Sequence, residues 1–392
     1  MDTRRLPFLD GLRIAALGLL IAYHVGMYYV TWGWHVKSPF ASPAAEPVMF
    51  LSSPWRMSLL FLISGAATSI LVARRGDGWL RPRLARLGWP LLFGMLVIVP
   101  PQSYFQVVEQ AGYDGGFLRF MGLYLSGYHG FCGADGGCLR LPTWNHLWFL
   151  PYLMVYTAGL WALLRAWPRA LDRAAAVLAS MPAALALFAG PWLLLAALRL
   201  ALRAHFEVTH ALVDDVLAHA QFLPAFAFGA LWARMPGAWA AAERLRWLAL
   251  AIALVAWATM VWGDGLPIEL LRAAYAAQQW CGVLAAVGFG HRHLGGDGPW
   301  RRRLSDAVFP VYVLHQTLIV VPAVALRPLG LAPALEAPLL AIGTLAGAAA
   351  IVVGLERLRA PGWLRRCLGM ADASRAVSAP RPAAGPARSS AR

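Results

Sequence analysis

Arg13 and His24 are the two residues of this chain whose types and spacing best suit joint chemistry. Both lie in an apolar segment, Phe8 to Tyr29, that reads FLDGLRIAALGLLIAYHVGMYY. Eleven positions separate them, which is about 16 Å of helix rise and close to three turns, so one helix face carries both side chains. An ionisable residue inside an apolar span is costly and usually points into a protein interior or a wet cavity. This spacing therefore predicts an anion-binding group near one membrane edge and a base deeper in the same cavity.

Each of these residues also has an ordinary structural interpretation. His24 suits a general base, because histidine has a reference pKa of about 6.5 and neutral imidazole accepts a proton. The alternative is a core histidine that is hydrogen-bonded to a neighbouring helix. Arg13 can hold a phosphate bidentately or polarise a carbonyl group. Its alternative is a salt bridge to Asp10, three residues back on the same face; both can hold if Asp10 orients Arg13.

The composition indicates a membrane protein. Of the 392 residues, 59% are hydrophobic and 14% are charged, with a mean hydropathy of +0.57, whereas ordinary globular domains carry roughly 25% charged residues. The net charge of +15 would favour nucleic-acid binding in a soluble protein, but these arginines gather in alternate loops. We expect an all-α integral membrane protein with one membrane domain, residues 1–360. Residues 361–392 are expected to form a basic cytoplasmic tail that is disordered.

Ten apolar segments have the length and composition of membrane spans. They are residues 8–31, 54–73, 86–105, 146–165, 183–201, 220–235, 246–263, 271–290, 307–326 and 335–356. With a cytoplasmic N-terminus, 25 of the 34 Lys and Arg residues fall on the inner side, eight on the outer side, and Arg13 within the first span. The positive-inside rule then predicts a bundle of about ten helices with both termini in the cytoplasm. A bacterial inner membrane is the simplest location.

The second long outer loop, residues 106–145, holds two of the four cysteines. Cys132 and Cys138 are the first and last residues of the sequence CGADGGC. A disulfide suits an oxidising periplasm, and free thiols are the next alternative. A metal site is disfavoured, because the two cysteines and nearby His129 supply too few ligands. We predict no bound metal, and the pairing of the cysteines stays open.

Several short motifs, in order along the predicted spans, point to a known family. After the first span they are WHVKS at 34–38, RMSLLFLISG at 56–65, RPRLARLGWP at 81–90, HLWFL at 146–150, FGHR at 289–292, FPVYVLHQ at 309–316 and Glu356 in the last span. Over about residues 6–360 the chain resembles the acyltransferase 3 family of integral membrane acyltransferases. WHVKS, RMSLLFLISG and FGHR are most similar to the branch called glucans biosynthesis protein C, which is associated with succinylation of periplasmic glucans.

The resemblance implies an enzyme that moves an acyl group, succinyl or acetyl, from a cytoplasmic acyl-CoA to a hydroxyl of a periplasmic or cell-surface glycan. It implies that Arg13 and His24 match the Arg-x10-His motif of the family, with His24 as general base, and that Arg81 and Arg83 match its Arg-x-Arg motif. Coenzyme A carries several phosphate charges, so Arg81, Arg83 and Arg86 could dock it. The alternative is that these arginines only enforce topology. Acyl-CoA is expected as a substrate, with no bound cofactor.

Further residues could face the cavity or the acceptor. This set is Arg56, His35, His146, Trp148, Tyr312 and His315, with Asp10 and Glu356 as supporting residues. The histidines could bind the acceptor or relay a proton, or they could be ordinary buried histidines. Arg56 could grip a sugar or an acyl carboxylate, or reach the interface as an anchor. Trp148 could stack on a sugar, although interfacial anchoring is the usual role of tryptophan at a membrane boundary.

Two other functions are compatible with the sequence. Buried Arg and His residues also occur in proton-coupled transporters, but no repeated halves with matching broken helices are visible. A translocator that only carries the acyl group across the membrane is the second alternative, since the sequence has neither a Gly-x-Ser-x-Gly elbow nor an appended periplasmic catalytic domain. The expected partners are acyl-CoA, a glycan acceptor and lipid, with no nucleic acid. The oligomeric state stays open.

Overall fold

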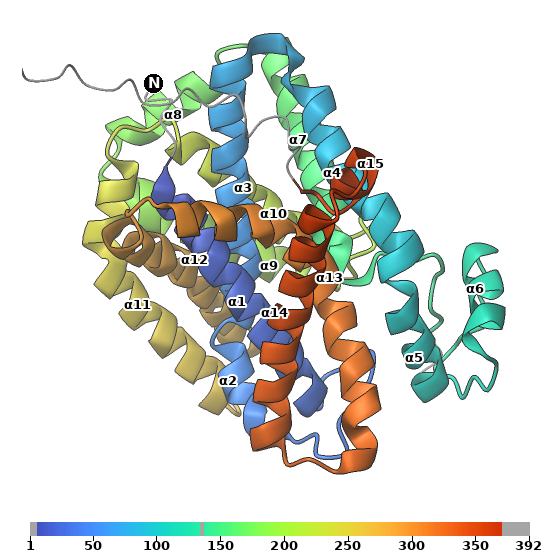
Figure 1. Cartoon of the computed structure of the whole chain (residues 1–392). Coiled ribbons are helices and arrows are strands. Elements are labelled where there is room, and N and C mark those ends of the chain that lie inside the picture. The colour runs from blue at the N-terminus through green and yellow to red at the C-terminus, as the bar shows by residue number, and fades with distance from the viewer. Residues whose placement is uncertain (1–5, 134–136, 371–392) are drawn as a thin grey trace, which may run out of the picture.

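The computed structural model describes residues 6–133 and 137–370, and these ranges form helices and loops with no strand (Figure 1). The α-helices are α1 (Pro7–Tyr29), α2 (Glu46–Phe50), α3 (Ser53–Arg75), α4 (Leu80–Phe93), α5 (Pro100–Gln110), α6 (Phe117–Leu125), α7 (Phe149–Ala166), α8 (Ala170–Ser180), α9 (Gly190–Leu202), α10 (Val216–Trp232), α11 (Ala238–Trp262), α12 (Ile268–His293), α13 (Pro299–Leu326), α14 (Pro333–Arg357) and α15 (Gly362–Cys367). Short 3-10 or π-helical segments are η1 (Pro43–Ala45), η2 (Gly76–Trp79), η3 (Gly94–Ile98), η4 (Asn145–Trp148), η5 (Ala184–Ala189) and η6 (Arg327–Leu329). The predicted all-α fold class is confirmed.

Seven helical segments of the described chain are long and apolar enough to cross a membrane. An eighth candidate is bent: Leu80–Ile98 and Pro100–Gln110 meet at 45°. The bend falls at Pro100 and Pro101, which lack the N–H groups that would continue the helical hydrogen bonds. The chain is therefore a multi-pass membrane protein with a broken helix inside the predicted span 86–105.

The remaining two predicted spans coincide with α10 and α12, which do not pass as full spans by length and hydropathy. Helix α10 has 17 residues, and α12 has 26 but is less apolar. Most of α12 is buried by other helices, where Gln279 donates to Ser58 Oγ at 2.8 Å and Gln278 donates to the Phe50 carbonyl at 2.7 Å. A helix surrounded by protein tolerates such polar side chains. Ten spans and the orientation of the termini therefore stay predictions.

Close packing of α3 on α10 depends on two glycines that face each other. A Cβ at Gly65 would lie 1.9 Å from the Phe226 carbonyl oxygen, and one at Gly229 would lie 1.9 Å from the Leu62 carbonyl oxygen. Neither position has room for any side chain, so the two backbones are in direct contact. Small residues at helix crossings are the usual way for membrane helices to gain van der Waals contact.

Helix α1 lies in the middle of the bundle, which puts its two predicted functional residues inside the protein. It packs against α3, α12, α13 and α14, and Figure 1 shows it crossing the centre of the molecule. Its apolar side chains, such as Leu17, Leu20 and Ile21, are buried in the main hydrophobic core.

The C-terminal segment contains more structure than we expected. Residues 361–392 were predicted to be disordered, but α15 is helical and packs against α4. The turn after the helix contains Gly369, which has a φ of +70°, and the Met370 N–H donates to the Arg365 carbonyl at 2.9 Å, as in a common glycine-terminated helix end. Leu368 and Met370 are buried, and this apolar anchor explains the order. Residues 371–392 lie outside the described residues.

The segment 106–145 carries a small core of its own and a disulfide. Cys132 and Cys138 form a disulfide. Of the alternatives left open by the sequence, namely a disulfide, free thiols and a metal site, the structure has the disulfide. Val107, Phe120 and Tyr124 form the apolar cluster beneath it. Figure 1 shows α6 at the edge of the molecule, away from the main bundle.

Candidate functional site

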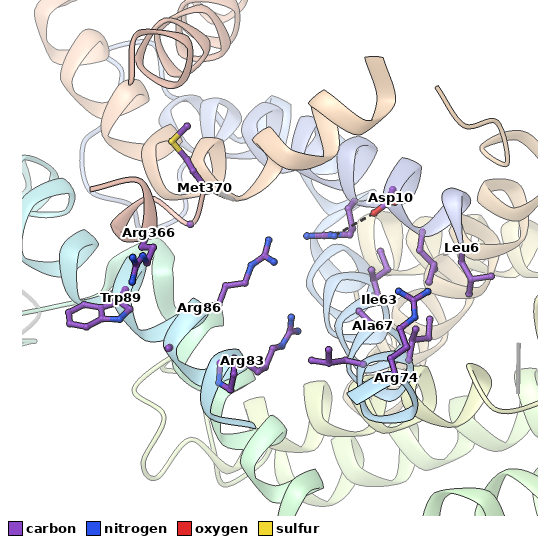
Figure 2. A pocket seen from close by; sticks show the side chains of 17 residues that line it. Leu6, Asp10, Ile63, Ala67, Arg74, Arg83, Arg86, Trp89, Arg366 and Met370 are labelled. Atoms are coloured by element: carbon purple, nitrogen blue, oxygen red, sulfur yellow. Dashed lines mark ion pairs between the residues drawn. The ribbon is translucent and has the colours of Figure 1, made fainter. Parts of the chain in front are cut away.

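A cavity of about 500 Å³ opens between α1, α3, α4 and α15, and the charged side chains among its lining residues are five arginines and one aspartate. Its arginines are Arg13, Arg74, Arg83, Arg86 and Arg366. Figure 2 shows Arg83 and Arg86 reaching from α4 into the space that Arg74 and Arg366 approach from other sides. We call this space the basic cavity. Its charge suits a polyphosphate ligand, because guanidinium groups pair bidentately with phosphate oxygens.

Asp10 is the one carboxylate among the lining residues of the basic cavity. It lies 3.6 Å from the Arg13 guanidinium and accepts a hydrogen bond of 3.1 Å from Ser305 Oγ. The salt bridge proposed from the sequence therefore forms, while Arg13 still lines the cavity. Asp10, fixed from α13, can hold the Arg13 side chain in one position.

A narrower, mostly apolar extension of about 150 Å³ continues from the basic cavity into the bundle. Arg13, Arg83 and Arg86 line both spaces. The extension then passes side chains such as Leu20 and Phe149 and reaches Tyr312 of α13. On α1 the extension reaches Leu20, one helical turn before His24, and His24 itself lines neither space.

His24 and His315 are hydrogen-bonded, and the geometry fixes which nitrogens carry protons. His315 Nδ1 lies 2.6 Å from the Tyr312 carbonyl oxygen, and a carbonyl only accepts, so His315 Nδ1 is the donor. In neutral imidazole the other nitrogen is then an acceptor. His315 Nε2 lies 2.9 Å from His24 Nδ1, so His24 Nδ1 donates to it. His24 Nε2 is left unprotonated, without a hydrogen bond to any described residue.

This arrangement suits proton transfer. An unprotonated imidazole nitrogen can take a proton from a hydroxyl group that binds next to it. When His24 becomes cationic, its Nδ1 proton still points at His315 Nε2, and a hydrogen bond to a charged group is stronger than a neutral one. His315 can thus orient His24 and stabilise its protonated form. In this role His315 does not touch the substrate and acts only through His24.

A second polar network, which includes His146, His35, Gln102 and Gln316, adjoins the histidine pair at His315. His146 Nε2 donates to the Val313 carbonyl at 3.0 Å, and its Nδ1 accepts from Gln102 at 3.4 Å. Gln316 donates to Gln102 Oε1 at 3.1 Å and to His35 Nε2 at 2.5 Å. Both nitrogens of His146 are therefore engaged in joining η4 to α5 and α13, which favours a positioning role over a role as base.

His35 is held in its neutral form. Its Nδ1 donates to Gln106 Oε1 at 2.6 Å while its Nε2 accepts from Gln316. Burial lowers the pKa of His35 to about 4, against a smaller opposing effect of the Gln106 hydrogen bond. His35 is therefore uncharged at neutral pH, and it contributes hydrogen bonds, not charge, to this second polar network.

Of the other predicted site residues, Tyr312 lies at a cavity, whereas Trp148, Arg81 and Glu356 do not line one. Tyr312 donates to the His146 carbonyl at 2.7 Å and lines the inner end of the extension. Trp148 is already stacked on His210, with ring centroids 4.0 Å apart. Arg81 and Glu356 are exposed and line neither cavity. The structure thus brings together Arg13, Arg83 and Arg86 but leaves Arg81 and Glu356 outside.

Sequence reasoning missed several residues of this site. Arg74 was counted only among the basic residues of the inner side, and Arg366 was placed in a disordered tail, yet both line the basic cavity. The apolar residues around Leu368 were the available signal that this segment docks. Gln102 was not singled out, although it bonds to four side chains: His146, Thr317, Asn145 and Gln316. No group of three potential metal-ligating side chains occurs among the described residues.

Comparisons with known proteins identify the family of the chain. Residues 6–353 match the family model described as an acyltransferase domain, Acyl_transf_3. Glucans biosynthesis protein C of Salmonella heidelberg (strain SL476) and that of Salmonella agona (strain SL483) are each 29% identical over 154 residues. The matched segment is 38% of this chain and 36% of each relative, so the chain spans about a third of the length of these relatives. No solved structure matches the chain.

Proposed function

Because the chain belongs to the acyltransferase 3 family, we propose that it is a membrane-embedded O-acyltransferase. It transfers an acyl group, succinyl or acetyl, from a cytoplasmic acyl-CoA to a hydroxyl of a periplasmic or cell-surface glycan. The name of the relatives, glucans biosynthesis protein C, makes a glucan the acceptor of choice. One observation carries the proposal: the arginine-lined basic cavity continues through an apolar extension toward a histidine with an unprotonated nitrogen.

The proposal requires a defined orientation in the membrane. Ten spans with both termini in the cytoplasm put the basic cavity at the inner face, where acyl-CoA is present. They put the loop 106–145 and its disulfide at the oxidising outer face. The excess of arginine in the segments assigned to the inner side supports this orientation, and a bacterial inner membrane fits it.

The two connected cavities match the parts of an acyl-CoA. Its phosphate groups bind the arginines of the basic cavity, and its acyl-bearing arm lies in the apolar extension. Arg13 lines both spaces, so it can hold a donor phosphate at the junction. Asp10, bonded to Arg13 and to Ser305, keeps that guanidinium in place.

His24 supplies the proton transfer. Its Nε2 removes the proton of the acceptor hydroxyl as the oxygen attacks the thioester carbonyl carbon. The carbon–sulfur bond breaks when the tetrahedral intermediate collapses, the new ester leaves on the glycan, and the CoA thiolate takes the proton back from His24. A positioned base of this kind contributes about 10²–10⁴-fold to the rate.

The decisive experiment measures ester formation by the purified full-length protein in lipid nanodiscs, with acetyl-CoA or succinyl-CoA and a glucan oligosaccharide. We expect ester and free CoA from the wild type and a loss of at least 100-fold in His24→Gln. His129→Gln, a change of the same type at an exposed outer histidine, is the matched control and should remain active.

Three other results would change the interpretation. Full activity in His24→Gln would remove His24 as the base. Wild-type protein that moves a labelled acyl group into the lumen of a sealed vesicle without forming ester would instead be a translocator. Proton-dependent solute uptake without acyl transfer would identify a transporter.

A further inference from the structure

Four of the eight basic residues assigned to the outer side gather at one place. They are Arg56 at the start of α3, Arg199 and Arg203 at the end of α9, and Arg272 near the start of α12. The positive-inside rule disfavours such a cluster on the outer side, so topology does not explain it. The other outer residues have separate surroundings: Arg327 pairs with Glu109 at 2.6 Å, for example, and Arg119 is exposed on α6.

Two of these arginines lie flat on tyrosine rings. The Arg56 guanidinium carbon is 3.5 Å from the centroid of the Tyr23 ring, and that of Arg199 is 3.4 Å from the centroid of the Tyr275 ring. Tyr275 also interacts electrostatically with Tyr23 and Arg56, so the two stacks adjoin. Stacking on an aromatic face stabilises a cation partly, but it supplies no negative charge to the guanidinium.

The two stacked arginines of the cluster have no carboxylate partner among the described residues. Arg56 is 5% exposed, and its described hydrogen bond goes to the neutral Ser52 Oγ at 3.3 Å. Arg56 Nε and two nitrogens of Arg199, Nε and Nη1, are shielded from solvent and have no hydrogen-bond partner among the described residues. Among the described residues, one carboxylate pairs with a member of the cluster: Glu207 lies 3.9 Å from Arg203. A buried cation without an anion is strongly unfavourable, so this cluster is incomplete without a bound anion.

The cluster also adjoins the proposed base. Tyr23 precedes His24 on α1, with ring centroids 5.9 Å apart, and Arg56 is close enough to His24 to interact electrostatically with it. We infer that Arg56, stacked on Tyr23 beside His24, and Arg199, stacked on the adjoining Tyr275, form a binding site for an anionic substrate group, a carboxylate or a phosphate. The guanidinium fork matches either oxyanion.

This inference rests on the proposed function for its position on the outer side of an acyl-transfer site. The anionic group has two possible sources. It is either the free carboxylate of a dicarboxylic acyl group such as succinyl, or a charged substituent of the glycan acceptor. In both cases the site selects charged over neutral substrates, because a neutral group would leave the buried arginines unpaired.

A binding experiment tests the site without requiring turnover. The thermal stability of the purified full-length protein in nanodiscs is measured against increasing monomethyl succinate or inorganic phosphate, with chloride holding the ionic strength constant. A ligand that binds the folded state raises the unfolding temperature. We expect stabilisation by at least one of the two anions in the wild type and in Arg119→Gln, and an apparent Kd at least tenfold higher in Arg199→Gln. Arg199→Lys, which keeps the charge, should lie between them.

The inference is overturned if neither anion stabilises the wild type, or if Arg199→Gln and Arg119→Gln bind both anions equally. Arg199 is preferred to Arg56 for this test because it is less buried, so its substitution disturbs folding less. Arg56→Gln is the second variant and should show the same loss of anion binding.

A kinetic experiment identifies the source of the anion. Ester formation is measured with acetyl-CoA or succinyl-CoA, each with a neutral or a phosphate-bearing glucan oligosaccharide. If Arg199→Gln raises KM at least tenfold only with succinyl-CoA, the site binds the acyl carboxylate; if only with the phosphate-bearing glucan, it binds the acceptor. An equal loss with all four pairs overturns the anion site while the transferase stands. Anion binding without any ester formation refutes the proposed function and leaves the site.

Discussion

At the scale of single residues, the bond between His24 and His315 makes a specific prediction. His315 accepts a hydrogen bond from His24 Nδ1 at 2.9 Å, and this bond becomes charge-assisted when His24 takes a proton. Hydrogen bonds to charged groups contribute about 1.5–3 kcal/mol, so losing this one should lower kcat about 10- to 100-fold. We expect His315→Leu to show this loss in initial rates of ester formation, with little change in KM for acyl-CoA.

His315→Gln is the matched control, because its amide oxygen can accept the same hydrogen bond. It should retain more activity than His315→Leu, at similar protein stability. Equal activities of the two variants would mean that His315 fills space and does not orient His24.

At the scale of helices, the contact between α3 and α10 fixes the frame around the site. Gly229→Ala places a Cβ against the Leu62 carbonyl oxygen, where the ideal distance is 1.9 Å. Backbone must then move, and overpacking of this kind costs about 1–3 kcal/mol. We predict a lower unfolding temperature in detergent for Gly229→Ala. Gly159→Ala on α7, where an added Cβ meets nothing within 4 Å, should be neutral or stabilising. Equal unfolding temperatures for the two variants would contradict this contact.

The helices also show what the sequence could and could not predict. Apolar length located every long helix, including α10 and α12, because hydropathy reports burial in lipid or protein alike. For the same reason it does not separate a lipid-facing span from α12, whose Gln278 and Gln279 are bonded inside the bundle. The bend at Pro100 was readable as two prolines, but its 45° angle depends on packing.

At the scale of the whole molecule, the site is made by distant segments. The spacing of Arg13 and His24 was predictable because one helix carries both. The partner of His24 was not, because His315 is 291 positions away and only the packing of α1 on α13 brings them together. Composition was also misleading for Arg366: a basic, proline-rich C-terminal segment predicts disorder, but apolar residues beside Arg366, such as Leu368 and Met370, are buried where α15 packs against α4.

This docking makes the C-terminal segment part of the proposed donor site, which can be tested. Arg366 lines the basic cavity with Arg83 and Arg86, so Arg366→Gln should weaken the binding of donor phosphates. At about 1.5–3 kcal/mol for a charge-assisted contact, KM for acyl-CoA should rise about 10- to 100-fold, with kcat nearly unchanged. Arg357→Gln removes the same charge from an exposed position outside both cavities and should leave KM within about twofold. An equal rise in both variants would mean that Arg366 acts only through the general positive charge of the inner face, and no rise in either would separate α15 from the donor.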